Sequence, residues 1–171
     1  MNQTTGLKAI AAERVRQIEQ ECFLPEQDDE LRNGELAQAA AAYAYPEGDG
    51  VSVFFQDLRG GLLFPAAFAA SWWKPGQGGY PRSRMRELEK AGALIAAEWD
   101  RLARLEENLA TFDGQNASTL SWTDWYGRLM EYSFVLGHGR EFVSDCGEEC
   151  WKDLYNDGLS VPEAFRAGFE E

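Results

Sequence analysis

The sequence predicts a mainly α-helical protein, with an interrupted N-terminal helical bundle followed by a small C-terminal helical module. Apolar residues recur at three- and four-residue steps over several segments, as on the buried side of a helix. Serine and acidic residues stand in capping order before two of these segments. Only one strong strand candidate interrupts the pattern, at residues 51–55. A chain of 171 residues is long enough to bury a substantial core.

Two helices are predicted before the interruption. The first spans about residues 5–22, and its apolar side comprises Leu7, Ile10, Ala11, Val15, Ile18 and Cys22. Pro25 and an acidic connector at residues 26–30 separate it from the next helix. That second helix is expected to start at Asn33 as the N-cap and to continue through an alanine-rich run to Tyr43. Its small side chains favour close helix packing.

An insertion of about residues 46–80 follows. Residues 51–55 and 62–64 flank a Gly-Gly pair and could form a short β-hairpin. Adjacent tryptophans, Trp72 and Trp73, then lead through Lys74 into a glycine-rich loop. Either ring could stack on a base, although adjacent tryptophans in a loop are more often packing anchors.

The longest predicted helix, residues 84–109 with Ser83 as its cap, carries a carboxylate on its apolar side. That side comprises Leu88, Ala91, Ile95, Leu102, Leu105 and Leu109. Glu98 occupies the step between Ile95 and Leu102. Because burying an isolated carboxylate costs several kcal/mol, Glu98 should be paired, protonated or bound to a cation. The pattern therefore indicates a polar site inside the bundle.

The polar segment 111–118 is the predicted linker, so the chain divides into a helical domain at 1–110 and an acidic, aromatic-rich helical module at 119–171. Helices are expected at about 121–135 and 148–155. Ser160 and Glu163 form a capping-box pattern before a last helix. The aromatic residues of this module are most simply a small core.

Charge and composition limit the function classes. The net charge is -13, and residues 111–171 alone contribute -8, with twelve acidic and four basic residues. Such a surface disfavours nucleic acid and anionic membranes and attracts basic partners, although solubility is the commoner explanation. The sequence shows no signal-peptide pattern and no stretch of about twenty apolar residues, so a cytoplasmic location is expected.

The cysteine count is odd, and reduced thiols are expected. Cys22, Cys146 and Cys150 could bind zinc only if all three converged with His138, the single histidine. Small core cysteines are the favoured alternative.

Several glutamates on or beside the apolar sides of the main helices could bind a divalent cation. They are Glu13, Glu21, Glu35, Glu87 and Glu98. Magnesium prefers oxygen ligands and completes its shell with phosphates, so carboxylates converging from different helices would suit nucleotide chemistry. Glu87 and Glu98 lie about 16 Å apart along one helix and cannot share an ion within it.

Four segments carry a family resemblance. Residues 33–40 (NGELAQAA) and 86–98 (RELEKAGALIAAE) resemble the helical pattern of MazG-like all-α nucleotide pyrophosphohydrolases. Residues 11–17 (AAERVRQ) and 72–75 (WWKP) are similar to small phage- and prophage-encoded proteins with this kind of domain. The resemblance covers residues 5 to about 107. It implies a homodimer and magnesium-dependent hydrolysis of nucleoside triphosphates.

The same resemblance implies ligand roles and shows departures. Glu35 matches the second glutamate of the family's first acidic pair, where Arg32 replaces the first. Glu87 matches the glutamate of the second pair, where Lys90 replaces an aspartate. With Glu98 added, the expected magnesium ligands are Glu35, Glu87 and Glu98. The expected substrate-binding residues are Arg14, Lys74, Lys90 and Trp73.

Two functions follow as hypotheses. The first is a phage-type MazG-like nucleotide pyrophosphohydrolase, or a nucleotide-binding relative that has lost efficient turnover. The second is a noncatalytic acidic interaction protein, such as a phage-encoded anti-defence inhibitor of a basic host nucleic-acid-binding protein. The surroundings of Glu98 distinguish the two hypotheses. If Glu98 shares a cation with Glu35 and Glu87, the enzyme hypothesis is favoured. If Glu98 forms an ion pair with Arg14, a noncatalytic scaffold is favoured.

Overall fold

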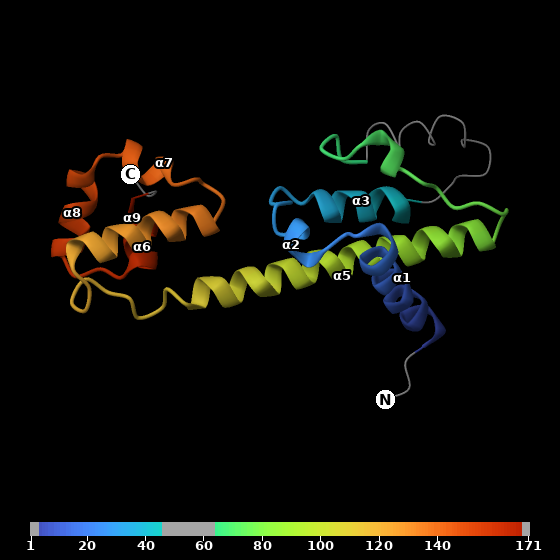
Figure 1. Ribbon diagram of the computed structural model, residues 1–171, viewed down its shortest axis with the longest axis horizontal. Helices are drawn as coiled ribbons and strands as arrows, with labels where there is room; N and C mark the ends of the chain where they lie inside the picture. The colour runs from blue at the N-terminus through green and yellow to red at the C-terminus, as the bar shows by residue number, and fades with distance from the viewer. Residues whose placement is uncertain (1–3, 46–63, 169–171) are drawn as a thin grey trace. The chain divides into compact units, whose positions relative to one another are not determined.

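The computed structural model describes residues 4–45 and 64–168, and the regular elements in these ranges are helices (Figure 1). They are α1 (Thr5–Glu21), α2 (Pro25–Asp28), α3 (Glu35–Ala44), the 3-10 turn η2 (Ala70–Trp72), α5 (Arg82–Ala110), α6 (Trp122–Val135), α7 (Glu141–Asp145), α8 (Glu148–Asn156) and α9 (Val161–Ala167). The predicted mainly α class is confirmed. The hairpin predicted at 51–55 and 62–64 lies almost wholly outside the described residues. Within the described ranges, no helix has both the length and the apolar character needed to cross a membrane.

The chain forms two compact units, Met1–Leu102 and Ala103–Glu171, divided within α5. The segment predicted as a linker belongs to the second unit. Phe112 is buried in the C-terminal core, and the Ala117 N–H donates to the Leu159 carbonyl at 3.3 Å. The Val161 N–H likewise donates to the Gln115 carbonyl at 3.1 Å. Backbone hydrogen bonds therefore tie the predicted linker to residues 159–161 at the start of α9.

Small residues bring the helices of the N-terminal unit together. Ala39 and Ala42 of α3 share a core cluster with Ala91 of α5. Where α1 meets α5, a Cβ added at Gly92 would lie 2.6 Å from the Ile10 side chain. Only glycine lets the two helices approach so closely. Figure 1 shows α3 running along α5 while α1 crosses it.

The ends of α3 are held by different devices. Its N-cap is Gly34, with φ 79°, so the expected start at Asn33 is wrong by one residue. Glycine is favoured there because other residues adopt positive φ at a cost. At the other end, Arg84 of α5 donates to the carbonyls of Tyr43 and Tyr45, at 2.9 and 3.1 Å, and to that of Ala44. A cation at this position satisfies terminal carbonyls and opposes the helix dipole.

The buried face of α5 is not the one that the sequence predicts. Its buried residues are Glu87, Ala91, Ala93, Ala97 and Arg101. Leu88, Ile95 and Leu102 of the predicted stripe are exposed, Ile95 by 54%. The neighbouring Trp99 is 73% exposed. Leu88, Ile95, Trp99 and Leu102 therefore face away from the core of their own unit, whereas Leu94 packs against it. Helical periodicity could not show this, because both faces repeat at the same spacing.

The C-terminal unit has an aromatic core. Trp125 and Trp151 are buried, and their indole N–H groups donate to the carbonyls of Leu159 at 3.1 Å and Val143 at 2.8 Å. These bonds satisfy the only polar atom of each ring, so the tryptophans can be buried at little cost. The predicted aromatic core is confirmed.

The predicted caps of two C-terminal helices are also present. Ser121 accepts a hydrogen bond from the Asp124 N–H at 3.2 Å before α6. Ser160 and Glu163 form the capping box of α9. Ser83, by contrast, lies inside α5, which begins at Arg82.

The cysteines are free and exposed, so they are not the small core residues that the sequence favours. His138 lies near the rings of Phe142 and Phe165, with centroid distances of 5.5 and 5.6 Å. Within the described residues, no group of three or more His, Cys, Asp or Glu side chains is placed to hold a metal ion.

Candidate functional site

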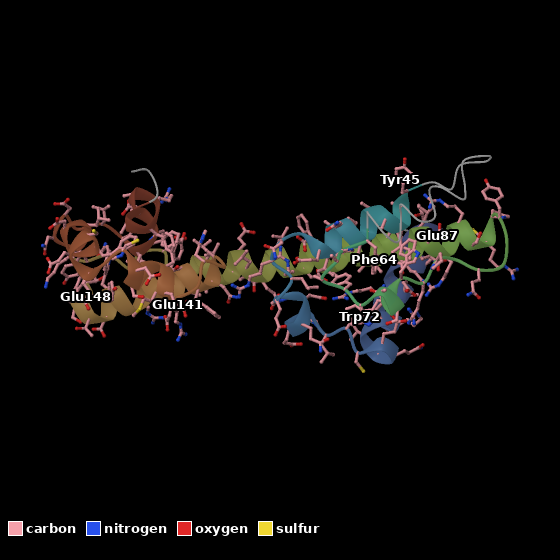
Figure 2. All side chains as sticks on the ribbon, turned by 90° about the horizontal axis from the view of Figure 1, so that it is seen from above. Tyr45, Phe64, Trp72, Glu87, Glu141 and Glu148 are labelled. Carbon is pink, nitrogen blue, oxygen red and sulfur yellow. The ribbon has the colours of Figure 1, made fainter. Side chains whose placement is uncertain are left out.

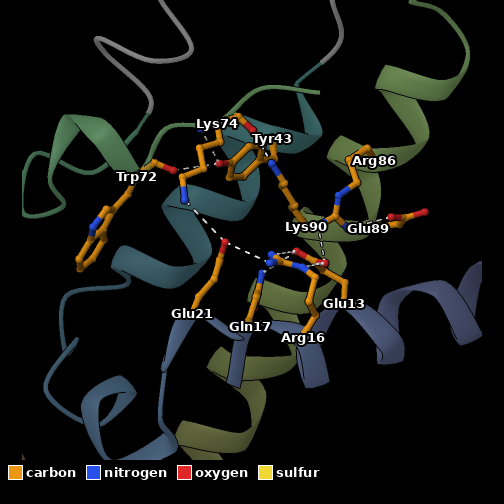
Figure 3. Close-up of polar contacts among 10 residues, drawn as sticks. All are labelled: Glu13, Arg16, Gln17, Glu21, Tyr43, Trp72, Lys74, Arg86, Glu89 and Lys90. Carbon is orange, nitrogen blue, oxygen red and sulfur yellow. Dashed lines mark hydrogen bonds and ion pairs between the residues drawn. The ribbon is translucent and has the colours of Figure 1, made fainter. Parts of the chain in front are cut away.

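A network of alternating charges occupies the region where α1, α5 and residue 74 meet (Figure 3). We call it the charge network; it consists of Glu13, Arg16, Glu21, Lys74, Arg86, Glu89 and Lys90. At its centre is Glu13, which is only 2% exposed. Glu13 Oε2 accepts from Arg16 Nε at 2.7 Å and from Arg86 Nη2 at 2.5 Å. The buried carboxylate is therefore held by two guanidinium groups.

The remaining carboxylates of the network are also paired with cations. Arg16 reaches Glu21 at 3.2 Å, and Lys74 approaches the same carboxylate at 3.6 Å. Arg86 Nη1 donates to Glu89 at 2.9 Å. With Lys90 included, the cationic side chains outnumber the carboxylates. The network is thus better suited to attract an additional anion than an additional metal ion.

The protonation of Glu13 follows from these contacts. Burial by itself raises the pKa of Glu13, but hydrogen bonds from Arg16 and Arg86 outweigh burial, so the pKa lies below its ordinary value. The hydrogen bond with Glu13 in turn raises the pKa of Arg16. Glu13 is accordingly ionised at neutral pH.

Tyr43 ties the tryptophan segment to the network. Its hydroxyl donates to the Trp72 carbonyl at 3.3 Å and accepts from the Lys74 N–H at 3.1 Å. Lys90 Nζ lies 5.2 Å from the centroid of the Tyr43 ring and donates to the Lys74 carbonyl. Burial, and then the charge of Arg86, lowers the pKa of Lys90. These contacts fix the backbone of residues 72–74 beside the charges.

A cavity of about 470 Å³ lies between α1, α2, α3 and residues 67–72. We call it the aromatic cavity, after Phe23, Phe68 and Trp72 in its wall. The centroid of the Trp72 ring lies 5.4 Å from the centroids of both Phe23 and Phe68. Its size falls within the usual range for small-ligand pockets, and its lining is mainly apolar, as in such pockets.

Polar groups of α1 and α2 complete the wall of the aromatic cavity. Arg14 Nη2 donates to Asp28 Oδ2 at 2.5 Å, and both residues are buried. Gln17, one helical turn after Arg14, is 5% exposed and also lines the cavity. Two buried atoms here, Arg14 Nε and Gln17 Oε1, have no hydrogen-bond partner.

A second, smaller cavity of about 60 Å³ shares wall residues with the aromatic cavity and is also lined by residues of the charge network. The residues that line both cavities are Gln17, Glu21, Phe23, Phe68, Trp72 and Leu94. Glu13, Arg16, Lys74 and Lys90 line only the smaller one. Apolar and cationic surfaces are therefore adjacent in one site.

The predicted substrate-binding residues have different positions in this site. Lys74 and Lys90 line the smaller cavity, and Arg14 lines the aromatic cavity. Trp73 lines neither; its ring stacks on Tyr43, with a centroid distance of 4.7 Å and an interplanar angle of 29°. The tryptophan in the cavity wall is its neighbour Trp72, labelled in Figure 2. One step along the chain decides which ring packs and which stays accessible.

The three predicted metal ligands each bind a different group. Glu35 accepts from the Asn33 N–H at 2.8 Å and from its side-chain amide at 3.0 Å. Glu87 accepts from the Gly76 N–H at 3.1 Å and from Arg84 at 3.2 Å. The structure does not assemble these residues with Glu98 into a group that could hold a metal, within the described residues. Magnesium binding itself stays a prediction.

The partner of Glu98 is an arginine of its own helix. Arg101 donates two hydrogen bonds to Glu98, from Nε and Nη2, both at 2.9 Å. The expected Arg14–Glu98 ion pair does not form. Arg14 pairs with Asp28 instead, and Glu98 pairs with Arg101. The hydrogen bonds with Glu98, and then the charges of Asp29 and Glu35, raise the pKa of Arg101. A fixed guanidinium thus neutralises Glu98.

Sequence reasoning missed three residues of the site, Arg16, Gln17 and Asp28, whereas Trp72 was considered only together with Trp73 as a ring that could stack on a base. Arg14 and Gln17 share a helical face, which could have drawn attention to Gln17. Asp28 gave no such signal, because it lies in a run of acidic residues that reads as a solvated connector.

No family model, curated protein or solved structure matches the chain at a significant level.

Proposed function

We propose that the N-terminal unit binds a nucleotide, as a MazG-like relative that has lost efficient magnesium-dependent turnover. One observation carries the proposal: an aromatic cavity shares a wall with a network in which cations outnumber carboxylates. A nucleotide has the matching chemistry, since its base offers a flat apolar surface and its phosphates offer negative charge. Arg16, Lys74 and Lys90 lie on the side where the phosphates would bind.

The pairing of the carboxylates supports binding over hydrolysis. A magnesium ion bound by this protein would have to compete with guanidinium groups for Glu13 and Glu98. Arg101 binds Glu98 through two hydrogen bonds, a geometry that is strong and specific. Magnesium also gives up its bound waters reluctantly. Weak or absent pyrophosphate release is the expected consequence.

The direct test is calorimetric titration with the common nucleoside triphosphates, with and without magnesium, alongside an assay of pyrophosphate release. Trp72→Leu and Lys74→Gln should each weaken binding by about tenfold, because they remove a ring from the aromatic cavity and a cation from its rim. Lys152→Gln, which neutralises an exposed lysine of α8, is the matched control. Absence of binding by every nucleotide at about 1 mM would refute the proposal.

A homodimer is part of the same proposal and has separate support in the structure. The exposed apolar side chains of α5 form one stripe: Met85, Leu88, Ile95, Trp99 and Leu102. Their steps of three, seven, four and three residues place them on one side of the helix, as on a helix that packs against another helix. Gly92, between Leu88 and Ile95, is already covered by Ile10 of α1. A monomer would leave this stripe in water, and large exposed apolar patches usually mark interfaces.

Sedimentation velocity tests the dimer. Ile95→Glu places a charge in the stripe and should convert dimers to monomers at micromolar concentration. Gln38→Glu adds the same charge at an exposed position of α3 and should leave the dimer unchanged. A monomeric native protein at about 100 μM would rule out this use of the stripe.

The acidic interaction function remains a second candidate because of the C-terminal surface. Its α7 and α8 region exposes the carboxylates of Glu141, Asp145, Glu148, Glu149, Asp153 and Asp157. Lys152 is the only basic residue between residues 141 and 157. Such a surface would recognise a basic protein, and it would do so mainly through long-range charge.

Titration with a purified basic DNA-binding protein at increasing salt tests this candidate. Binding should weaken steeply with salt and should be lost when Glu148, Glu149 and Asp153 are neutralised together. Neutralising three exposed acids of the N-terminal unit, Glu19, Glu26 and Glu30, provides the control. Equal binding by both triple variants would argue against recognition through α7 and α8.

A further inference from the structure

Among the described residues, two of the three buried side-chain atoms that lack a hydrogen-bond partner belong to residues that line the aromatic cavity. Arg14 Nε is a donor and Gln17 Oε1 is an acceptor, and neither makes a hydrogen bond. Their residues are one helical turn apart on α1, and both line the aromatic cavity. Leaving a buried donor or acceptor unsatisfied is costly, so natural interiors contain few such atoms. Both atoms are enclosed in the cavity wall as it stands, so two of them in one wall indicate that these side chains turn toward a ligand that supplies the missing partners.

The neighbouring contacts limit how these groups can act. Arg14 is anchored through Nη2 on Asp28, which leaves its Nε free to donate. The Gln17 amide nitrogen makes only a long contact, 3.4 Å, with Glu13. The terminal torsion of a glutamine is broad, so its amide can turn toward either cavity that it lines. A guanidinium anchored at one nitrogen thus lies one helical turn from an adjustable amide.

We propose that Arg14 and Gln17 read the hydrogen-bonding edge of a nucleobase whose ring lies against Trp72 in the aromatic cavity. This inference rests on the proposed nucleotide binding and deepens it. The ligand class is a planar heterocycle with an acceptor next to a ring N–H or amino donor. Arg14 Nε donates to the acceptor, and Gln17 Oε1 accepts from the donor. The smaller cavity then takes the phosphates toward Lys74 and Lys90.

Pairs of related ligands test whether the unaltered protein recognises the hydrogen-bonding edge of the base. Uridine triphosphate is compared with its N3-methyl derivative, and inosine triphosphate with purine riboside triphosphate. Each second compound keeps the ring and the phosphates but lacks the N–H donor. The edge-bearing member of each pair should bind at least about tenfold more tightly, because a site built around hydrogen bonds rejects ligands that leave its groups unpaired.

A substitution tests whether Gln17 causes the preference for ligands that carry the N–H donor. Gln17→Met keeps a side chain of similar length but removes the amide, so both members of a pair should bind equally. Gln20→Met makes the same change at an exposed position of α1 and should preserve the preference. Circular dichroism and thermal melting check that both variants fold. If Gln17→Met does not fold, the paired ligands on the unaltered protein still decide.

The outcomes separate this inference from the proposed function. Equal binding within both pairs by the unaltered protein would overturn base-edge recognition while leaving nucleotide binding in place. Inorganic triphosphate binding as tightly as the nucleotides would overturn base recognition altogether. Failure of every nucleotide to bind would overturn the proposed function and this inference together. A preference that persists in Gln17→Met would remove Gln17 from the site.

Discussion

The two units of the chain differ in how many polar side chains they bury and in the size of the apolar ones. In the N-terminal unit the buried polar residues are Glu13, Arg14, Gln17, Asp28, Glu87 and Arg101. The apolar residues buried in the described part of this unit are mostly alanines, together with Leu36, Tyr43 and Phe64. In the C-terminal unit, by contrast, Ser133 is the only buried polar residue among those described. Its interior is filled by large apolar side chains such as Trp125, Leu129 and Trp151.

The difference shows what each interior is suited to do. Large apolar side chains stabilise a fold in proportion to the area that they remove from water. Buried ion pairs contribute little on balance, and apolar replacements of equal volume are often as stable. The aromatic core therefore explains how the C-terminal unit folds. The buried charges of the N-terminal unit are better explained by a ligand or by the need for one specific packing.

The largest effect is expected where the aromatic core is emptied. Trp151→Ala should reduce the free energy of unfolding by about 3–5 kcal/mol, through lost burial and the cavity left behind. It also removes the hydrogen bond to the Val143 carbonyl, 2.8 Å long. Urea denaturation followed by circular dichroism measures the change. Phe134→Ala, at a half-exposed ring of the same unit, should cost less than about 1 kcal/mol.

In the N-terminal unit, breaking a buried pair should cost nearly as much as emptying the aromatic core. Arg14→Met removes the guanidinium from buried Asp28 and should destabilise the protein by about 3 kcal/mol. Replacing both residues, as Arg14→Met with Asp28→Leu, should recover most of this loss. Denaturation of the single and double variants completes the cycle. A double variant that loses the sum of both single effects would show that the pair is not a coupled unit.

Replacing one glycine in each unit by alanine should change the stability in opposite directions. Gly92→Ala brings a Cβ to 2.6 Å from Ile10 and should destabilise by about 1–2 kcal/mol despite the better helix propensity of alanine. With Ile10→Ala in the background, the same change should become stabilising. Gly127→Ala in α6 meets nothing within 4 Å and should stabilise by up to about 1 kcal/mol. Thermal melting gives all three signs.

The smallest expected effect is on how the free energy of unfolding depends on pH. Because the arginine contacts hold the folded-state pKa of Glu13 below its ordinary value of 4.5, the ionised form stabilises the folded protein. This contribution is complete above about pH 4.5 and is lost as the pH falls through the folded pKa. Urea denaturation between pH 3 and pH 6 should show a shallower acid dependence for Glu13→Gln. An unchanged slope would mean that Glu13 is not ionised in the folded state.

The caps and the aromatic core of the C-terminal unit follow from the sequence because their causes are local. Ser121 and Ser160 cap the residues that come directly after them, and a tryptophan-rich segment has few ways to avoid burial. The partner of Glu98 was equally near, at Arg101, yet the apolar stripe drew attention to the wrong face of α5. Two faces of one helix with the same period cannot be ranked without their neighbours.

By itself, the sequence determined the helical class, the chemistry of each unit and the need to neutralise Glu98, because periodicity, composition and desolvation act on single segments. Only the tertiary structure decided that Glu13 is the central buried carboxylate, that Trp72 lines the cavity while Trp73 packs, and that Arg14 binds Asp28. The pairing of buried Glu13 with Arg86 depends on α1 crossing α5, where Ile10 packs on Gly92. No pattern within one helix encodes that crossing.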